Sequence, residues 1–280
     1  MRSNIIFFIS ILTTLNIYSQ NNLSLYERVK NNDSLREKKV NEYMVKNNLE
    51  KSIFYNGKTY ILYNIIDNKP IYRSTYNQIG AAVTQTNHLQ VGGSLGLDLE
   101  GSGITVGVWD EGPAQASHVE FQNSDNSATR ITNIDLNSVY GTTEDQNHAT
   151  HVSGTIGAKG VSPEAQGMAT NVSIITYNFN GDTGKMIAAQ EDSTYDVFLS
   201  NHSYGVYVSQ PGGSLLDSWY MGAYDSSARE IDNIASSYPY YLIVQSAGND
   251  GNTNYPDGLY SGYDKLTTDK NAKNNLVVAN

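Results

Sequence analysis

The chain of 280 residues contains no cysteine. A fold that depends on disulfide bridges is therefore excluded, so stability has to come from core packing and from any bound ions. Long apolar runs are also scarce, since the only one spans residues 5–15. That run is shorter than the ~20 residues that a helix needs to cross a bilayer. We therefore expect no membrane association once the N-terminal stretch has been removed.

Basic residues are few from residue 99 onward. Residues 1–98 carry eleven Lys/Arg and seven Asp/Glu, whereas residues 99–280 carry seven Lys/Arg and twenty-one Asp/Glu. Nucleic acids are bound by basic surfaces, so no nucleic-acid partner is expected. The basic and acidic parts could attract one another, although an acidic surface that only aids solubility explains the charge equally well.

The first nineteen residues have the pattern of an export signal. Arg2 supplies the positive start, residues 5–15 the apolar stretch, and Tyr18-Ser19-Gln20 a small-residue cleavage site. We therefore predict a signal peptide over residues 1–19 and a protein that is secreted to the extracellular medium.

Residues 20–95 differ in character from the rest of the chain. Residues 24–49 are polar and rich in Lys and Glu, with apolar positions at only roughly helical intervals. In the stretch 58–75, β-branched and aromatic residues flank Asp67-Asn68-Lys69-Pro70, which predicts a β-hairpin. A Gly-rich stretch ends at Gly103 and indicates a boundary. We expect a small α+β unit here.

Short and nearly continuous apolar runs recur from residue 103 onward. Such runs are typical of strands buried on both faces of a parallel sheet. Helical patterns lie between them, one beginning near His148, one over 184–192 and the longest within 214–237. The alternation predicts an α/β fold with a parallel sheet. The expected strands are 103–110, 171–179, 196–205, 240–249 and 274–280.

Polar residues end several of these runs, and ligands bind beyond the carboxyl ends of parallel strands. Asp110 ends the first run, Asn201-His202-Ser203 ends another, and Asn249-Asp250 ends a third. These side chains should gather at one edge of the sheet. By position alone, Asp110 could equally be a helix N-cap or a turn residue.

Two histidines stand three residues apart in "NHATHVSGTIGA", residues 147–158. His148 could act as a general base if a buried carboxylate such as Asp110 orients it. The rival hypothesis is a zinc site shared by His148 and His151, although the zinc-peptidase helix has a spacing of four with an intervening Glu. Gly154 and Gly157 each cost roughly 1 kcal/mol in a helix relative to alanine, which predicts close packing of this helix against backbone.

Two further segments could take part in peptide chemistry. The amide of Asn249 in "QSAGNDG" could donate to a developing oxyanion, but Ala-Gly-Asn is also a common turn. The segment "NHSYG" offers a strand edge at Gly205 against which an extended peptide could pair. An ordinary exit from strand to loop would explain that segment as well.

Taken together, five segments in this order resemble the motifs of the subtilisin-like serine proteases. The segment "GITVGVWDEG" (103–112) resembles the strand with the catalytic aspartate, and "NHATHVSGTIGA" (147–158) resembles the histidine helix. The strand that follows that helix is matched by "GMATNVSIITYNF" (167–179). The substrate-binding segment is matched by "SNHSYG" (200–205) and the oxyanion segment by "QSAGNDG" (245–251).

The resemblance implies a role for each matching residue. Asp110 would orient His148, which would be the base, His151 would be structural, and Asn249 would bind the oxyanion. The substrate-binding positions are Ser203, Tyr204 and Gly205, and His118 and Phe121 fall where the aspartate motif usually continues. The implied fold is a three-layer parallel-sheet catalytic domain.

Some residues depart from the pattern of the family. Ala149 replaces a usual glycine, and Trp109 and Glu111 are unusual neighbours of Asp110, as in a secreted bacterial subgroup. The Gly-Thr-Ser-Met-Ala motif that carries the nucleophile does not occur. Ser203 and Ser246 lie in other family segments, so neither replaces it.

We therefore expect a secreted serine endopeptidase precursor that cleaves polypeptides and ends before its nucleophile. Residues 1–19 would be the signal, 20–95 a prosegment that binds its own enzyme, and 96–280 an incomplete peptidase domain. The alternative is a catalytically inactive secreted binding or adhesion protein with the same fold. No cofactor or catalytic metal is expected to be required, and the resemblance allows structural calcium.

Overall fold

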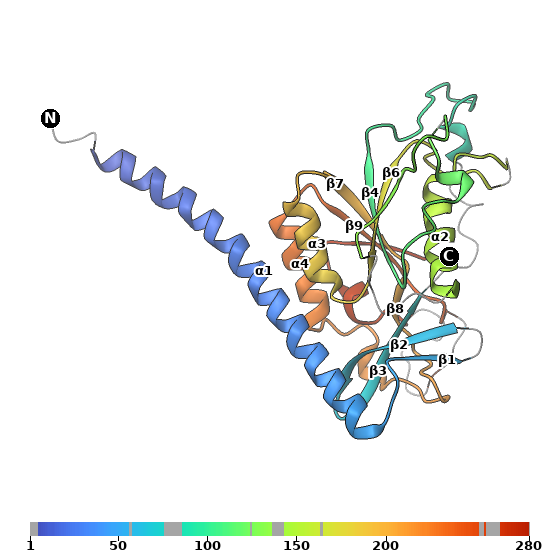
Figure 1. Cartoon of the computed structure of the whole chain (residues 1–280). Coiled ribbons are helices and arrows are strands. Elements are labelled where there is room, and N and C mark those ends of the chain that lie inside the picture. The colour runs from blue at the N-terminus through green and yellow to red at the C-terminus, as the bar shows by residue number, and fades with distance from the viewer. Residues whose placement is uncertain are drawn as a thin grey trace.

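The structure, a computed structural model, consists of an N-terminal segment (residues 5–75) and a larger body (residues 86–279) that contact each other (Figure 1). Both parts are interrupted by short gaps. The described residues are 5–55, 58–75, 86–123, 125–135, 143–162, 165–251, 255 and 264–279.

The body is built on a six-stranded sheet with the order β10-β9-β7-β4-β6-β5, in which every pair of neighbours is parallel. All five predicted strands are present, which confirms the predicted α/β fold, and β5 is an addition. The strands are β4 (Thr105–Asp110), β5 (Ile131–Asn133), β6 (Ser173–Asn178), β7 (Val197–His202), β9 (Leu242–Ser246) and β10 (Leu276–Val278).

Helices cover both faces of this sheet, giving three layers (Figure 1). Helix α2 (Thr143–Gly157) packs on one face through Ala149 and Val152, which share a cluster with Val106 and Val108 of β4. Helices α3 (Asp182–Glu191) and α4 (Ser226–Ser237) cover the opposite face. Successive side chains of β4 point to opposite faces, which is why one strand serves both cores.

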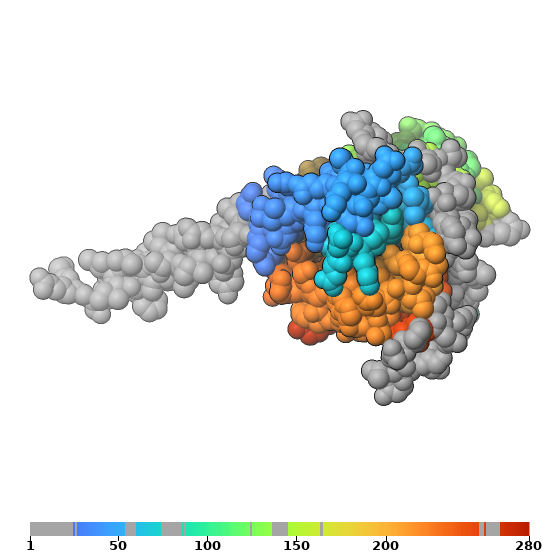
Figure 2. Space-filling view, turned by 90° about the horizontal axis from the view of Figure 1, so that it is seen from below, coloured from blue at the N-terminus to red at the C-terminus, as the bar shows by residue number. Residues whose placement is uncertain are grey.

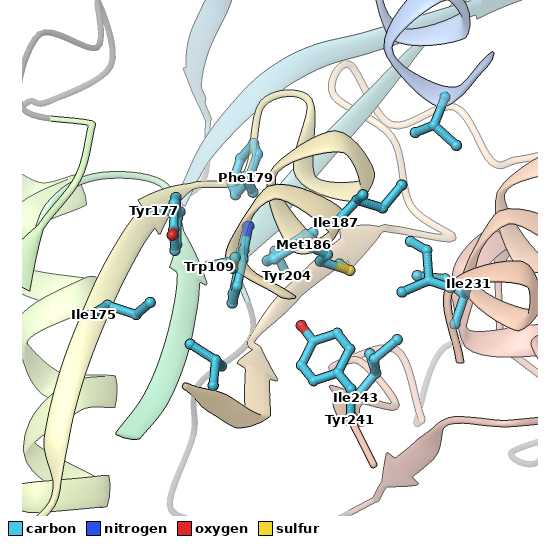
Figure 3. Packing of buried hydrophobic residues seen from close by; sticks show 14 of the residues in the cluster. Trp109, Ile175, Tyr177, Phe179, Met186, Ile187, Tyr204, Ile231, Tyr241 and Ile243 are labelled. Carbon is cyan, nitrogen blue, oxygen red and sulfur yellow. The ribbon is translucent and has the colours of Figure 1, made fainter. Parts of the chain in front are cut away.

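The second core is centred on Trp109 (Figure 3). The indole ring stacks on Tyr177 of β6, with 4.5 Å between ring centroids, and on His202 of β7 at 5.2 Å. Gly107 makes room for that ring, because a Cβ atom there would lie 2.3 Å from the indole. Trp109, unusual beside a strand-ending aspartate, is therefore a packing residue.

Two helix predictions need correction. The helix that carries His148 begins at Thr143, five residues before the predicted start. The stretch 214–237 does not hold the longest helix, because α4 begins only at Ser226, after Asp225 caps it by accepting a hydrogen bond from the Ala228 amide (3.0 Å). The apolar side chains of Leu215 and Trp219 that suggested an earlier start are exposed.

The end of α2 does pack against backbone as predicted, because the Met168 amide donates to the Thr155 carbonyl at 3.0 Å, but the glycine that makes the room lies outside the helix. A Cβ at Gly154 would meet no atom within 4 Å, and one at Gly157 would lie 3.0 Å from the Val172 side chain. The close backbone approach is made from the other side, by Gly167. A Cβ there would lie 2.6 Å from the Gly154 carbonyl oxygen, so the loop before β6 passes directly over the end of the helix.

The N-terminal segment consists of one helix and three strands, namely α1 (Ile5–Asn47), β1 (Ser52–Tyr55), β2 (Lys58–Ile66) and β3 (Lys69–Thr75). The predicted hairpin is confirmed, with Asp67 and Asn68 in the turn at positive φ. Strand β3 also pairs with a short body strand, β8 (Tyr204–Val206), so the segment's sheet has the order β1-β2-β3-β8.

The N-terminal segment shares hydrophobic cores with the body. Tyr207, which follows β8, is buried with Val40, Tyr60, Leu62 and other residues of the segment. Ile71 of β3 is likewise buried against Val206 and two more body residues. Figure 2 shows the segment lying directly on the part of the body that follows β8.

The predicted signal peptide and domain limits stay predictions. Residues 1–4 and the side chains of residues 5–24 lie outside the described residues, and the helix α1 continues through residue 19.

Short 3₁₀ turns complete the list of described elements, namely η1 (Thr86–His88), η2 (Val119–Phe121), η4 (Ser218–Tyr220) and η5 (Thr268–Asn271). Within the described part of the chain, no helix has the length and apolar character required to cross a membrane.

We predict that Leu62→Ala lowers the free energy of unfolding by about 2–5 kcal/mol, because it removes a fully buried side chain from the shared core. Urea denaturation followed by circular dichroism measures this. Leu35→Ala is the matched control, since Leu35 is 56% exposed, and its effect should stay within about 0.5 kcal/mol. Equal effects of the two variants would contradict the shared core.

Candidate active site

The end of β4 and the first half of α2 bring Asp110 and His148 together. Asp110 is fully buried, and its Oδ1 lies 2.8 Å from His148 Nδ1. The same oxygen accepts a hydrogen bond from the Glu111 amide at 2.8 Å. Asp110 therefore ends a strand and orients a histidine, and it caps no helix.

The second ring nitrogen of His148 is unpaired. The His148 side chain as a whole is 18% exposed, but its Nε2 is buried and has no hydrogen-bond partner among the described residues. With Nδ1–H donated to Asp110, Nε2 is the basic nitrogen of a neutral imidazole. The arrangement can accept a proton from a hydroxyl group placed next to Nε2, and Asp110 would stabilise the imidazolium that results.

His151 takes no part in this pair. It is exposed on α2 and lines a surface cavity of about 550 Å³, together with His118 and other residues. His118 caps the turn η2 by accepting from the Glu120 amide at 3.3 Å, and Phe121 at the end of that turn is buried.

The described residues contain no group of three or more His, Cys, Asp or Glu side chains that could hold a metal ion. The donor set of His148 and His151 is therefore too small for a zinc site in this part of the chain. Structural calcium stays an expectation of the family resemblance, and no step below depends on it.

The predicted substrate-binding residues lie in and just before β8. Ser203 Oγ accepts a hydrogen bond from Asn201 Nδ2 at 2.8 Å, and Tyr204 is buried in the core. An extended segment already pairs with the edge of this strand, because Gly205 and Tyr204 lie opposite Ser74 and Thr75 of β3. The predicted strand edge is thus covered by the N-terminal segment.

Asn249 lies in the turn after β9. Gly248 has φ +107°, a conformation that favours glycine and turns the chain away from the sheet. The Asn249 side chain is exposed, and its Nδ2 lies 3.4 Å from the Tyr207 hydroxyl. The next residue, Asp250, accepts from the Val208 amide at 2.8 Å, so this turn is tied to the segment that follows β8.

Behind β8 lies a buried polar chain that the sequence analysis missed. The Tyr241 hydroxyl donates to Ser200 Oγ (2.7 Å), which lies 2.7 Å from His202 Nε2. His202 Nδ1 lies 2.8 Å from the Tyr204 hydroxyl, which donates to Asp182 Oδ2 (2.8 Å). Since Tyr204 donates to Asp182, His202 has to donate through Nδ1 and accept through Nε2. All hydrogen bonds therefore point toward Asp182, and His202 is neutral.

Asp182 ends this chain in an ion pair with the N-terminal segment. Arg73 Nη1 donates to Asp182 Oδ2 at 2.6 Å, and both side chains are about 1–2% exposed. Burial opposes ionisation of Asp182, but the charges of Arg73 and Arg36 outweigh it and lower the pKa of its carboxyl. Arg73 lies in the second strand of the predicted hairpin, and its partner is 109 positions away.

Comparisons with known proteins identify the family of this chain. A family model described as the subtilase family matches residues 101–279. The curated "Serine protease/ABC transporter B family protein tagD" of Dictyostelium discoideum is 24% identical over 201 residues, covering 66% of this chain and 10% of that protein.

Two solved structures are similar to part of this chain. The CspB protease of Clostridium perfringens is 24% identical, with a TM-score of 0.37, over 55% of this chain and 38% of that chain. Fervidolysin from Fervidobacterium pennivorans, described as a keratinolytic enzyme related to subtilisin, is 18% identical with a TM-score of 0.36, over 69% and 32%. The chain thus spans less than half the length of each of these proteins.

We predict that acid destabilises this protein partly through His202. Burial lowers the pKa of His202 to about 4 from 6.5, although Asp182 and Asp269 favour its protonated form. Between these values the unfolded chain binds a proton that the folded chain does not, so stability falls as the pH falls through this window. The contribution is on the order of 3 kcal/mol.

Urea denaturation at neutral pH and near pH 4 measures this, with His202→Gln as the variant that does not titrate. The fall in the free energy of unfolding should be smaller in the variant by that amount. Acidic groups away from His202 contribute equally in both proteins, so the difference reports on His202 together with Asp182, whose pKa His202 helps to lower. Equal pH profiles would show that His202 is not held neutral in the folded protein.

Proposed function

Because this chain belongs to the subtilase family, we propose that it is the precursor of a secreted serine endopeptidase. The observation that carries the proposal is the contact between Asp110 Oδ1 and His148 Nδ1 at 2.8 Å, with His148 Nε2 left for a substrate or a nucleophile. The substrate would be a polypeptide. Both residues lie within the part of the chain that matches the family model.

In the proposed reaction, His148 Nε2 takes the proton of a serine hydroxyl as that hydroxyl attacks the peptide carbonyl carbon. Asp110 holds the imidazole in the Nδ1–H tautomer and stabilises the imidazolium. His148 then gives the proton to the leaving amine, and a water molecule repeats the sequence on the acyl-enzyme. Asn249 is assigned to the oxyanion, where one donor is worth ~10²–10³ in rate.

The attacking serine is proposed to lie outside residues 1–280. The Gly-Thr-Ser-Met-Ala motif does not occur in these residues. Ser200 is buried and hydrogen-bonded to His202 and Tyr241, and Ser203 accepts from Asn201. Neither serine is joined to His148 by a described hydrogen bond, in keeping with a nucleophile elsewhere.

The N-terminal segment is proposed to act as a prosegment that inhibits its own enzyme. Strand β3 covers the edge of β8, which contains two of the three proposed substrate-binding residues. The segment also shares buried clusters with the body and forms two ion pairs with it, Arg73–Asp182 and Lys69–Asp217. A peptide substrate could pair with β8 only after β3 has left.

A fluorophosphonate probe, which labels activated serines, tests the catalytic proposal. The product of the whole reading frame should be labelled on a serine after residue 280, and the 280-residue chain should not be labelled. His148→Ala should reduce labelling by several orders of magnitude, because the serine loses its base. His151→Ala should leave most of the labelling in place.

Three results would overturn the catalytic proposal. Labelling of a serine within residues 1–280 would move the nucleophile into this chain. Full loss of labelling in a folded His151→Ala protein, restored by zinc, would favour the metal hypothesis. A long product that folds but is never labelled and cleaves no peptide would favour the alternative, a catalytically inactive binding or adhesion protein.

We predict that the N-terminal segment stays docked at high ionic strength. Surface attraction between a basic segment and an acidic body is screened within ~3 Å at about 1 M salt, but buried contacts are screened much less. Amide hydrogen exchange of residues 69–75 in the 280-residue chain should therefore be equally slow in low salt and in about 1 M sodium chloride. Loss of protection in high salt would indicate that surface charge alone holds the segment.

A further inference from the structure

The edge of β8 recognises an extended chain in a defined register. Val206 lies opposite Arg73, Gly205 opposite Ser74 and Tyr204 opposite Thr75, in an antiparallel pair. Among the described strands, β8 is the last of its sheet, with β3 as its neighbour there. Peptides that add to a sheet edge bind through backbone hydrogen bonds, and pockets for individual side chains give the specificity.

Strand β8 begins close to the carboxyl ends of the parallel strands of the body. Trp109 pairs with His202, so Asp110 lies one residue past the last paired position of β4 and β7. Strand β8 starts at Tyr204, two residues after His202. A peptide that pairs with β8 therefore lies at the same edge of the sheet as the Asp110–His148 pair.

One side chain of the bound strand enters a buried socket. The guanidinium of Arg73 is about 1% exposed and donates to Asp182 Oδ2 at 2.6 Å. It lies 3.4 Å from the centre of the Tyr63 ring, within its own segment, and 5.4 Å from the centre of the Tyr204 ring. Asp182 and Tyr204 both belong to the body. Lys69, at the other end of β3, makes only an exposed ion pair with Asp217 at 3.0 Å.

The body alone holds the carboxylate of this socket in position. Asp182 Oδ1 accepts from the Thr183 amide at 2.9 Å, and Oδ2 accepts from the Tyr204 hydroxyl at 2.8 Å. The two guanidinium groups that lower the pKa of its carboxyl, Arg73 and Arg36, both belong to the N-terminal segment. When the segment leaves, the body keeps a carboxylate that Thr183 and Tyr204 orient and that has lost both of these cations.

We propose that Asp182 is a specificity-determining residue that selects polypeptides with an arginine opposite Val206. The incoming arginine takes the place of Arg73, donates to Asp182 and lies over the ring of Tyr204. Lysine fits less well, because an ammonium is a point charge without the planar fork that pairs with a carboxylate and stacks on a ring. This inference rests on the proposed peptidase function, whose substrate it specifies.

A peptide-binding experiment tests the socket without requiring catalysis. The receptor is the 280-residue chain with Arg73→Gln, in which an added peptide competes with a β3 that has lost its ion pair with Asp182. The probes are a fluorescent peptide with the sequence of residues 69–75 and the same peptide carrying Arg73→Gln. Fluorescence anisotropy should show that the arginine peptide binds about 30-fold more tightly or better. A lysine peptide should fall in between.

Matched variants separate the socket from general attraction. Adding Asp182→Asn to the receptor should reduce the preference for arginine to less than about threefold. Removing the exposed pair instead, with Lys69→Gln in the peptide, should change affinity by less than about fivefold. Near-ultraviolet circular dichroism verifies the fold of each receptor, and an Arg73→Lys receptor repeats the series if the Gln variant unfolds. Equal binding of the arginine and glutamine peptides to a folded receptor would overturn the proposal.

Cleavage of a randomised peptide library by the labelled long product distinguishes the two proposals. Enrichment of arginine at one position before the cleaved bond, lost in Asp182→Asn, supports both. Cleavage without that enrichment, together with equal peptide binding, overturns the role of Asp182 and leaves the peptidase intact. Tight arginine-peptide binding by a protein that cleaves nothing overturns the peptidase proposal and with it this role in substrate choice.

Discussion

A carboxylate that is buried at the end of a parallel strand needs hydrogen-bond donors, and this requirement organises the body of the protein. Asp110 is fully buried at the end of β4, and its donors are the next backbone amide and the ring of His148. The second donor is available only if α2 packs across the sheet with His148 near its middle. Burial of Val106, Val108 and the small residues of α2 on one face provides that packing.

The opposite face of the same strand has a structural role. Trp109 fills that side, stacked between Tyr177 and His202, and its ring lies where any side chain at position 107 would stand. His202 thereby becomes part of a dry interior, in which the neutral imidazole is favoured. Adjacent residues of β4 therefore have different roles, since Asp110 belongs to the candidate catalytic pair and Trp109 belongs to a packing core.

The junction between the N-terminal segment and the body combines apolar and charged contacts. The apolar clusters bury side chains of both parts together, whereas the Arg73–Asp182 pair requires that β3 dock in one register. A shift of β3 by one residue along β8 would turn Arg73 to the other face and leave two buried charges unpaired, which is strongly unfavourable. The ion pair therefore contributes specificity of docking beyond the attraction between a basic and an acidic part.

Much of this architecture could be predicted from the sequence. Apolar runs that end in polar residues indicate parallel strands, the turn residues at 67–68 indicate the hairpin, and the motif order indicates the family. These signals are local, because strand burial, turn conformation and motif spacing are each encoded within a few consecutive residues.

What only the tertiary structure decided are the contacts between distant positions. Periodicity places Asp110 at a strand end, but the 2.8 Å approach of His148 depends on how α2 lies on the sheet. Arg73 lies in the predicted hairpin, but neither its partner Asp182 nor its place on β8 could be read from spacing. A buried charge requires a partner of opposite sign, but the sequence does not say which one, since the fold alone brings residues 109 positions apart into contact.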